Sequence, residues 1–514
     1  MKHSILISGV IALLFFSTVQ AQNRLSIDAT TEGPQISKYI YGHFAEHLGR
    51  CIYDGIWVGP DSPIPNINGY RKDVFEALKA LDIPVLRWPG GCFADTYQWK
   101  TGIGPRETRP KIKNVFWGGT VEDNSFGTHE FLDLCEMLGC EAYVSVNVGS
   151  ATVWDMVEWI EYMTSDDDLP MANLRRQNGR EKPWKVKFLG VGNESWGCGG
   201  NMTPEFYSDL LRQYSTYAEQ YGRGMTRVGC GANGGDYNWT RVLMQKASRH
   251  MDALSVHYYT IAGPGWNNKT AATGFGEDLY FSGIRSGLGM DNLLKRHISV
   301  MDEYDPRKRV GLYVDEWGIW TDVEPGTNPG FLFQQNSMRD ALIAATTFDI
   351  FNKYSDRVKM ANIAQTVNVL QAMILTEGDK MLMTPTYHIF NMYKVHGDAT
   401  LLPSNLITEK YTFGNESVPA LSQTVSKDAS GKIHISLSNV NPGKELKVTI
   451  DMVGGTIKKV NKGEILTASI YNAVNTFDKP NTIKTTEFKG YKMVNPTTLE
   501  VTLPALSAVT LQVE

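Results

Sequence analysis

Residues 187–194 read KFLGVGNE, and residues 311–316 read GLYVDE. Each stretch is a nearly continuous apolar run that closes on a glutamate, which is typical of a strand buried on both faces. Six more runs of this kind occur along the chain, at residues 39–46, 85–88, 142–147, 227–231, 253–259 and 360–368. The sequence therefore predicts eight buried strands in series.

Amphipathic segments separate the predicted strands. Residues 74–81 and 131–138 both carry apolar side chains at helical spacing, which would let one face of each helix pack against the sheet. Eight β–α units favour a closed (β/α)8 TIM barrel of the α/β class over an open sheet, which has fewer strands and a phosphate loop after the first one. We therefore expect the barrel to cover residues 38–395.

The pattern changes beyond the predicted barrel. Three later stretches alternate apolar and polar residues, at 433–437, 446–450 and 499–503. This alternation predicts an all-β, jelly-roll-like sandwich over residues 396–514. All twelve tryptophans lie between Trp57 and Trp320, so we expect the sandwich to be structural and the barrel to carry the chemistry.

The first 21 residues have the composition of a cleavable signal peptide. Lys2 precedes an apolar run over residues 5–16, and Val19 and Ala21 stand where a signal peptidase reads the chain. The alternative is an uncleaved anchor, for which the run is short, since a span takes about 20 residues. We therefore expect residues 1–21 to be removed and the protein to be periplasmic or secreted.

The 514 residues are 42% hydrophobic and carry a formal net charge of −5. This composition is that of an ordinary globular protein. No long basic run occurs, so nucleic acid is not an expected partner. No segment after the first one is apolar enough to predict a membrane span.

Six cysteines are spread along the chain: Cys51, Cys92, Cys135, Cys140, Cys198 and Cys230. An even number permits disulfides in an oxidising compartment, but free, mostly buried thiols are the simpler interpretation and the connectivity stays open. Neither a CxxC pair nor a Cys/His cluster occurs, so no zinc site is predicted.

The predicted strands end in polar side chains. In a barrel the active site forms at the carboxyl ends of the strands. The groups found there are Glu46, Arg87, Asn147, Asn193 with Glu194, His257 to Tyr259, Glu316, and Gln365 to Asn368. Only the fifth predicted strand ends without such a group. Burying a carboxylate costs free energy unless the group is paired or takes part in function. This set therefore indicates a functional site at the open end of the barrel.

Two glutamates stand out, because Glu194 closes the fourth predicted strand and Glu316 closes the seventh. Two carboxylates that face one pocket can divide the roles of acid and nucleophile, which is what glycoside hydrolysis needs. Asn193, directly before the first of them, could bond a sugar 2-hydroxyl group. The pair therefore predicts a glycosidase.

Three other motifs are weighed and set aside. Residues 43–47 fit H-x-x-E-H, but a strand end separates the two histidines, whereas a zinc protease needs both on one helical face. Residues 229–234 fit G-x-G-x-x-G but lead into a loop and not a helix, so no dinucleotide cofactor is expected. Residues 193–195 form a glycosylation sequon, where a glycan would block the pocket.

These residues resemble glycoside hydrolase family 51, the α-L-arabinofuranosidases. The matching pieces run in family order, at residues 41–50, 87–91, 97–99, 102–105, 192–194, 257–259, 315–317 and 364–369. The resemblance implies a retaining mechanism with Glu194 as acid/base and Glu316 as nucleophile. It also implies that residues 22–37 add a strand to the C-terminal sandwich. Many members are oligomers, so a homo-oligomer is an open alternative to a monomer.

The resemblance assigns supporting roles as well. It implies that Glu46, Asn193 and Gln365 hold the arabinose hydroxyls, that Tyr259 orients the nucleophile, and that His257 supports the acid/base. The remaining site residues that we expect from the motifs are Arg87, Trp99 and Cys92. Cys92 departs from the family pattern, because some members carry a sugar-binding Asn at this position. We expect it to pack near the pocket, without a part in the chemistry.

The sequence thus predicts an exported, exo-acting arabinofuranosidase that needs no cofactor or metal and acts on an arabinofuranosyl-containing carbohydrate. A retaining endo-glucanase or xylanase on a similar barrel is the alternative among enzymes. A non-catalytic sugar-binding protein is the alternative from another class. Paired glutamates count against pure binding, because binding sites prefer neutral amides and aromatic rings.

Overall fold

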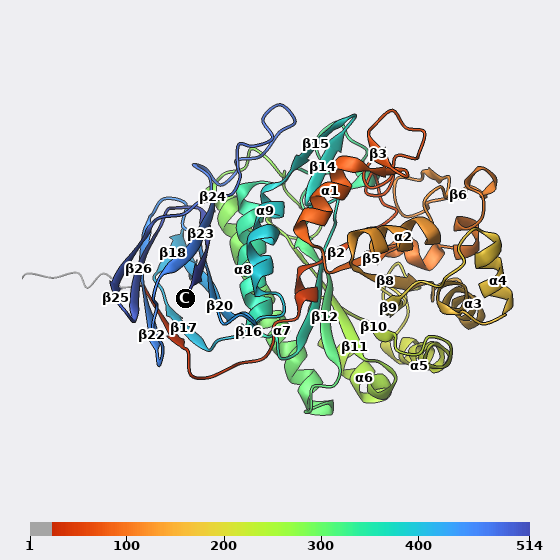
Figure 1. Cartoon of the computed structure of the whole chain (residues 1–514), viewed down its shortest axis with the longest axis horizontal. Coiled ribbons are helices and arrows are strands. Elements are labelled where there is room, and N and C mark those ends of the chain that lie inside the picture. The colour runs from red at the N-terminus through yellow and green to blue at the C-terminus, as the bar shows by residue number, and fades with distance from the viewer. Residues whose placement is uncertain (1–22) are drawn as a thin grey trace, which may run out of the picture.

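The computed structural model describes residues 23–514 and contains a closed barrel of eight parallel strands (Figure 1). In chain order they are β2 (Gly42–Phe44), β5 (Val85–Trp88), β8 (Glu141–Val146), β9 (Val186–Val191), β10 (Thr226–Asn233), β11 (Ala253–Thr260), β12 (Gly311–Ile319) and β13 (Val358–Ile363). Their buried, nearly continuous apolar runs confirm the predicted (β/α)8 barrel.

Helices surround the barrel. They are α1 (Lys72–Leu81), α2 (Thr128–Leu138), α3 (Val153–Thr164), α4 (Pro170–Gln177), α5 (Pro204–Tyr221), α6 (Tyr237–Ala247), α7 (Glu277–Tyr304), α8 (Met338–Lys353) and α9 (Pro385–Tyr393). Short hairpins decorate the loops: β3 (Asn66–Ile67) with β4 (Tyr70–Arg71), β6 (Ile112–Lys113) with β7 (Val121–Glu122), and β14 (Ile374–Glu377) with β15 (Lys380–Met383).

Several strand boundaries differ from the predicted ones, and the first and fifth strands differ in instructive ways. The first strand is only three residues long, because the 3-10 turn Lys38–Tyr41 takes up the first half of the predicted segment. Ser37 caps this turn by accepting the Tyr39 backbone N–H. The fifth strand is longer than predicted and ends at Asn233.

The C-terminal domain is a sandwich of two sheets. One has the order β17 (Ser404–Ile407), β1 (Asn23–Asp28), β22 (Leu446–Val453), β26 (Thr498–Leu503), β25 (Tyr491–Asn495). The other has the order β16 (Thr400–Leu401), β20 (Leu421–Lys427), β21 (Ile433–Asn439), β27 (Ser507–Val513), β23 (Val460–Thr467), β24 (Thr486–Glu487). A separate hairpin of β18 (Lys410–Phe413) and β19 (Glu416–Pro419) projects from the sandwich.

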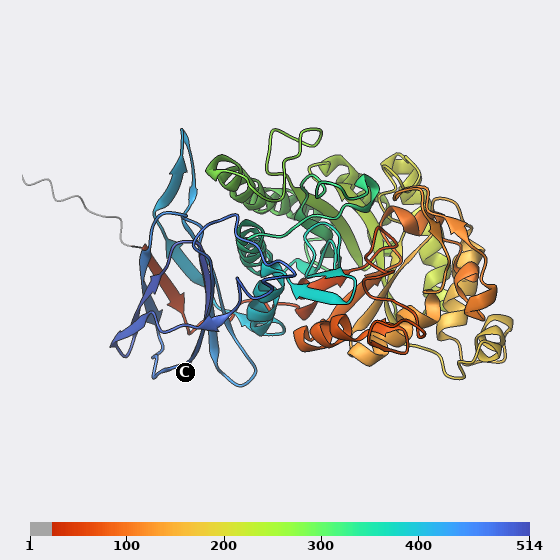
Figure 2. The same cartoon turned by 90° about the horizontal axis from the view of Figure 1, so that it is seen from above.

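The first described strand belongs to the last domain. β1 pairs in parallel with β22 and antiparallel with β17, and Figure 2 shows it in red among the blue strands of the sandwich. Its buried apolar residues, Leu25 and Ile27, belong to the hydrophobic core. From Asn23 onward, the chain thus leaves the sandwich, passes through the whole barrel and returns.

Helix α8 joins the two domains. Every residue from Met338 to Asn352 is buried, because the barrel covers one side of the helix and the sandwich covers the other (Figures 1 and 2). Asp349 faces the sandwich and accepts the hydroxyl hydrogens of Ser422 and Thr424 at 2.6 and 2.7 Å. Among the described helices, none combines the length and the apolar character needed to cross a bilayer.

Candidate active site

A cavity of about 520 Å³ lies at the carboxyl ends of the barrel strands. Because parallel strands end at the same edge, their terminal side chains meet there. The predicted site residues that line it are Glu46, Cys92, Glu194, His257, Tyr259, Glu316 and Gln365. Arg87 and Asn193 are buried against these residues, whereas Trp99 lies elsewhere.

Glu194 enters the cavity from the loop after β9. Gly192 and Glu194 both take positive φ angles, of 81° and 42°. A left-handed backbone is unfavourable for a glutamate, so surrounding contacts must hold it. Asp95 supplies one of them, because its carboxylate accepts the backbone N–H of Asn193 at 3.1 Å.

His257 bridges the two glutamates. Its Nδ1 lies 2.8 Å from Glu194 Oε1 and 3.4 Å from Glu316 Oε2. Its Nε2 lies 3.2 Å from Asp315 Oδ1. Burial opposes a charge on the ring, but the three carboxylates outweigh it and raise the pKa of His257 to about 10. The ring is therefore protonated at neutral pH and donates to Glu194.

The two glutamates are close together but differ in their surroundings. One carboxylate oxygen of Glu194 and one of Glu316 lie within 4.8 Å of each other. Burial and the charge of Glu316 raise the pKa of Glu194, although the His257 hydrogen bond opposes the shift. Glu316 instead accepts from Arg87 Nη1 at 2.9 Å and from the Tyr259 hydroxyl at 2.8 Å. These surroundings suit Glu194 to act as an acid and hold Glu316 as a paired carboxylate.

Arg87 and Asn193 form the floor beneath the pair. Besides its contact with Glu316, the Arg87 guanidinium donates to the Asn193 side-chain oxygen. The NH2 group of Asn193 is then left buried without a protein partner. A buried donor without a partner costs about 1 to 3 kcal/mol, so this group is suited to a hydroxyl that a ligand supplies.

Glu46 is held on the opposite wall. It accepts from Gln365 Nε2 at 3.0 Å, from Trp117 Nε1 at 2.8 Å and from the backbone N–H of Phe93 at 3.1 Å. Burial and the charge of Glu316 raise the pKa of Glu46 to about 7. A Cβ at Gly91 would lie 2.5 Å from its carboxylate, which explains why this turn takes glycine.

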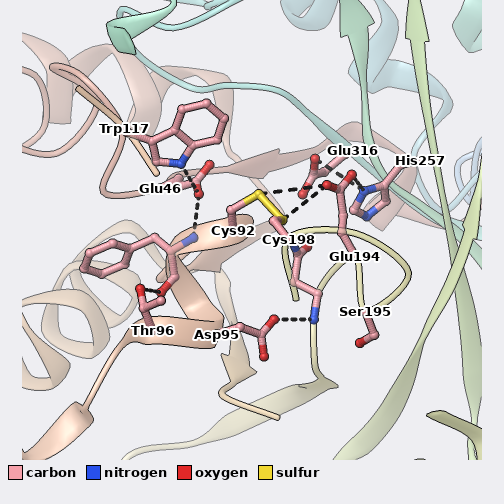
Figure 3. Close-up of a disulfide and its surroundings, with 12 residues drawn as sticks. Glu46, Cys92, Asp95, Thr96, Trp117, Glu194, Ser195, Cys198, His257 and Glu316 are labelled. Carbon is pink, nitrogen blue, oxygen red and sulfur yellow. Dashed lines mark hydrogen bonds and ion pairs between the residues drawn. A yellow bond between two sulfur atoms is a disulfide. The ribbon is translucent and has the colours of Figure 1, made fainter. Parts of the chain in front are cut away.

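Cys92 and Cys198 form a disulfide, which corrects the interpretation that all six thiols are free. Cys92 begins the 3-10 turn after β5. Cys198 lies in the loop after β9, the same loop that carries Glu194, so the bond ties two loops at the cavity wall (Figure 3). The two positions are 106 residues apart and meet only in the folded barrel, so spacing could not reveal the pair. The remaining cysteines are free: Cys51, Cys135, Cys140 and Cys230.

Trp99 is a second correction, because its ring does not reach the cavity. It is buried, stacks on Trp159 of α3 and donates its indole N–H to the backbone carbonyl of Asp155 at 3.0 Å. Trp99 therefore packs the helical layer behind the barrel strands.

Several lining residues were not singled out from the sequence. They are mostly aromatic or apolar: Trp117, Trp196, Trp266, Trp320, Leu332 and Leu370. The available signal was the crowding of tryptophan in loops that follow strands. Asn233 lines the cavity too, because β10 runs past its predicted end; the fifth strand thus does end in a polar side chain.

The side chains of the H-x-x-E-H motif, residues 43–47, do not come together at one site. His43 is buried, and desolvation lowers its pKa to about 3. The Nδ1 of His47 lies 3.3 Å from Glu122, whereas Glu46 faces the cavity. Within residues 23–514 the groups whose spacing could hold a metal ion lie at the cavity itself: Cys92, Glu194 and Cys198, and Glu194, His257 and Glu316.

Two family models match the chain. The Alpha-L-arabinofuranosidase 1 domain matches residues 77–260, and the Alpha-L-arabinofuranosidase C-terminal domain matches residues 315–507. The two matches include Glu194 and Glu316, respectively.

Relatives match over most of the length. A protein of Bacteroides ovatus named intracellular exo-alpha-L-arabinofuranosidase is 55% identical over 518 residues, which is 100% of both chains. A probable alpha-L-arabinofuranosidase C of Aspergillus flavus is 32% identical over 82% of this chain and 86% of its own. The crystal structure of the GH51 arabinofuranosidase from Xanthomonas axonopodis pv. citri has a TM-score of 0.94 and 47% identity, and covers 96% of this chain and 100% of its own.

The name of the Bacteroides ovatus relative contradicts one prediction. That protein is named intracellular and matches this chain along its whole length, so the prediction of a periplasmic or secreted protein is wrong. A short apolar run after one lysine is a signal of composition alone. The predicted signal peptide, residues 1–21, lies outside the described residues.

The matches and the paired glutamates agree on one assignment. These three relatives are each named as arabinofuranosidases. The chain therefore belongs to the α-L-arabinofuranosidases of glycoside hydrolase family 51, and it is a glycoside hydrolase with arabinofuranosidase activity.

Proposed function

We propose that the enzyme is exo-acting and retaining, and that it releases terminal non-reducing α-L-arabinofuranosyl residues from polysaccharides or oligosaccharides. The observation that carries the proposal is the spacing of Glu194 and Glu316, which have one carboxylate oxygen each within 4.8 Å. Retaining glycosidases hold their carboxyl groups about 5 to 5.5 Å apart, whereas inverting ones need roughly 6.5 to 9.5 Å to admit a water. The spacing supports attack by a carboxylate.

Glu316 is the nucleophile in this proposal. Arg87 and Tyr259 each bind one of its oxygens, so the carboxylate is oriented before the sugar enters. Its attack on the anomeric carbon forms an arabinosyl ester and expels the leaving oxygen. Water then hydrolyses the ester, which restores the original anomeric configuration.

Glu194 is the acid and then the base. His257 donates to Oε1, which leaves Oε2 to carry the proton that the leaving oxygen takes. Formation of the ester removes the negative charge of Glu316, so the pKa of Glu194 falls. The same group can then accept a proton from the attacking water.

The sugar hydroxyls would meet the polar walls of the cavity. Glu46 and Gln365 are linked to each other and present oxygens to it, while the unpartnered NH2 group of Asn193 offers a donor. We assign this donor to the 2-hydroxyl group, a contact that strengthens in the transition state.

The alternatives receive less support. A xyloglucanase from Paenibacillus polymyxa, among the similar structures, shares 12% identity at a TM-score of 0.62, which is a likeness of fold alone. A pure binding protein would have no use for two carboxylates whose surroundings separate acid from nucleophile. Hydrolysis of a panel of aryl glycosides should show a strong preference for the α-L-arabinofuranoside over the glucoside and xyloside.

The stereochemical test is transglycosylation to methanol. A retaining enzyme gives methyl α-L-arabinofuranoside as the first product, and NMR distinguishes it from the β-anomer. A first-formed β-anomer would overturn the retaining mechanism and require a new role for Glu316.

A further inference from the structure

The disulfide of Cys92 and Cys198 lies against the proposed acid. The Cys92 and Cys198 sulfur atoms lie 4.0 and 3.5 Å from Glu194 Oε2. Figure 3 shows the disulfide beside the Glu194 carboxylate. A disulfide carries no S–H group, so it donates no hydrogen bond to this oxygen. Glu194 Oε2, the oxygen to which we assign the acidic proton, therefore faces two sulfurs that are inert in the oxidised protein.

Reduction would change the chemistry of these sulfurs. A dithiol or phosphine reductant supplies the two electrons that, with two protons, convert the disulfide to two thiols and is itself oxidised to a disulfide or a phosphine oxide. The resulting thiolates are soft ligands that select zinc and similar ions. In a tetrahedral zinc site, bonds of about 2.3 Å to sulfur and about 2.1 Å to oxygen put those two ligand atoms about 3.6 Å apart. The Cys198 contact with Glu194 already has this spacing, and the Cys92 contact exceeds it slightly.

We propose that reduction of the Cys92–Cys198 disulfide creates an inhibitory site for zinc or another thiophilic divalent cation, with the two thiolates and Glu194 as ligands. A water would complete the tetrahedron. The bound cation would occupy the carboxylate that must protonate the leaving group, so hydrolysis would stop. In the oxidised protein the sulfurs are bonded to each other and the site is closed. The inhibition rests on the proposed acid/base role of Glu194, whereas the binding of metal does not.

Both redox forms are relevant to a protein with this pair. Disulfides persist in oxidising compartments, whereas cytosolic thiols are kept reduced. The same sequence would thus be insensitive to zinc in one environment and sensitive in the other.

The first experiment compares two preparations of the wild-type protein. One is kept oxidised, and the other is treated with a phosphine, which takes up oxygen from water to form its oxide as the disulfide becomes two thiols. Thiol counts on the denatured protein verify the two states. After the phosphine is removed, zinc chloride is titrated against hydrolysis of 4-nitrophenyl α-L-arabinofuranoside.

We expect half-inhibition of the reduced protein at a zinc concentration roughly 100-fold lower, because two thiolates are gained as ligands. A chelator should then restore the activity. Equal sensitivity of the two preparations would overturn the proposal. This comparison uses no variant, so it does not depend on whether a mutated chain folds.

A second measurement detects the metal without catalysis. Cobalt(II) replaces zinc in such sites, and thiolate ligation gives it a charge-transfer absorption. We expect this band in the reduced wild-type protein and its loss in the Cys92→Ser/Cys198→Ser double variant. The matched control is Cys135→Ser/Cys140→Ser, which removes the other neighbouring pair of thiols, at the end of α2, and should keep the band.

The two readouts separate the possible failures. A cobalt band that persists in the Cys92→Ser/Cys198→Ser variant would place the metal elsewhere and end the proposal. The other failure is a cobalt band that disappears in the Cys92→Ser/Cys198→Ser variant while zinc leaves hydrolysis by the reduced wild-type protein undiminished. That result would refute the inhibition and would also count against Glu194 as the acid/base.

Discussion

Glu194 and Glu316 are the same residue type, and only their neighbours give them different tasks. Burial and a nearby negative charge favour the protonated form of Glu194, whereas Arg87 and Tyr259 satisfy both oxygens of Glu316. Each can therefore be tested by removing its side chain and observing which step of the reaction suffers.

Glu194→Ala should depend on the leaving group. With an alkyl arabinofuranoside, whose alkoxide needs a proton to depart, we expect kcat/KM to fall about 100- to 10,000-fold. A 2,4-dinitrophenyl substrate should lose far less in its first step, and azide should restore turnover by attacking the ester that water can no longer hydrolyse. Equal losses on both substrates without azide rescue would remove Glu194 from this role.

The alkaline limb of the pH profile should belong to Glu194. Its pKa is raised, and the acid acts only while protonated, so kcat/KM should fall as the pH rises through that pKa. With an activated aryl substrate, Glu194→Gln should lose this limb. Glu46 also has a raised pKa, of about 7, so its ionisation is the competing explanation for an alkaline limb. Glu46→Gln, although weaker in binding, should keep the limb; a profile that flattens there instead would assign the limb to Glu46.

At the scale of elements, the loops that follow the strands determine how the site is shaped. The turn after β5 carries Gly91 against the Glu46 carboxylate and then Cys92 against Glu194. The contact between Gly91 and Glu46 leaves no space for a Cβ. Replacing Gly91 by alanine, which adds one methyl group, therefore tests the role of this turn.

Gly91→Ala should displace the Glu46 carboxylate, because the new Cβ would lie 2.5 Å from it. We expect kcat/KM to fall roughly 100-fold, the scale that a 1 Å misplacement can cost. Gly235→Ala is the matched control, since a Cβ there meets only the Tyr237 ring, at 3.7 Å. Circular dichroism should show both variants folded, and a Gly91→Ala enzyme as active as the control would contradict the packing.

The barrel and its two glutamates were predictable because each depends on local pattern. A buried parallel strand must be apolar along its length, so a glutamate at its end, such as Glu316, is conspicuous. The disulfide and the place of Trp99 were not predictable, because both depend on which loops meet across the barrel. Asn233 was missed because the end of β10 is set by pairing with β11 and not by its own residues.

At the scale of the whole molecule, Asp349 connects the two domains through a buried carboxyl group. Burial raises its pKa from 3.8 to about 7, despite the hydrogen bonds from Ser422 and Thr424. Between those two values the folded protein holds a proton that the unfolded chain releases. The free energy of unfolding should therefore decrease as the pH rises through this window, by on the order of 4 kcal/mol.

Asp349→Asn should remove that part of the pH dependence. We expect the urea midpoint of the wild type to fall more between pH 5 and pH 8 than that of the variant. Asp478→Asn is the control, because Asp478 is about 90% exposed and should leave the wild-type slope unchanged. Parallel slopes for wild type and Asp349→Asn would show that the buried group keeps its ordinary affinity for protons.

The position of β1 in the sandwich has a consequence for biosynthesis. Asn23 bonds the backbone of Lys447, 424 residues later, and the ribosome adds about 5 to 20 residues per second. β1 therefore waits roughly 20 to 85 s for its parallel partner, β22, to be translated. During that interval the barrel strands and α8 are translated, but the sandwich that covers the outer side of α8 is still incomplete. The sandwich is complete only when the C-terminal strands have been translated and β17 and β22 have paired with β1.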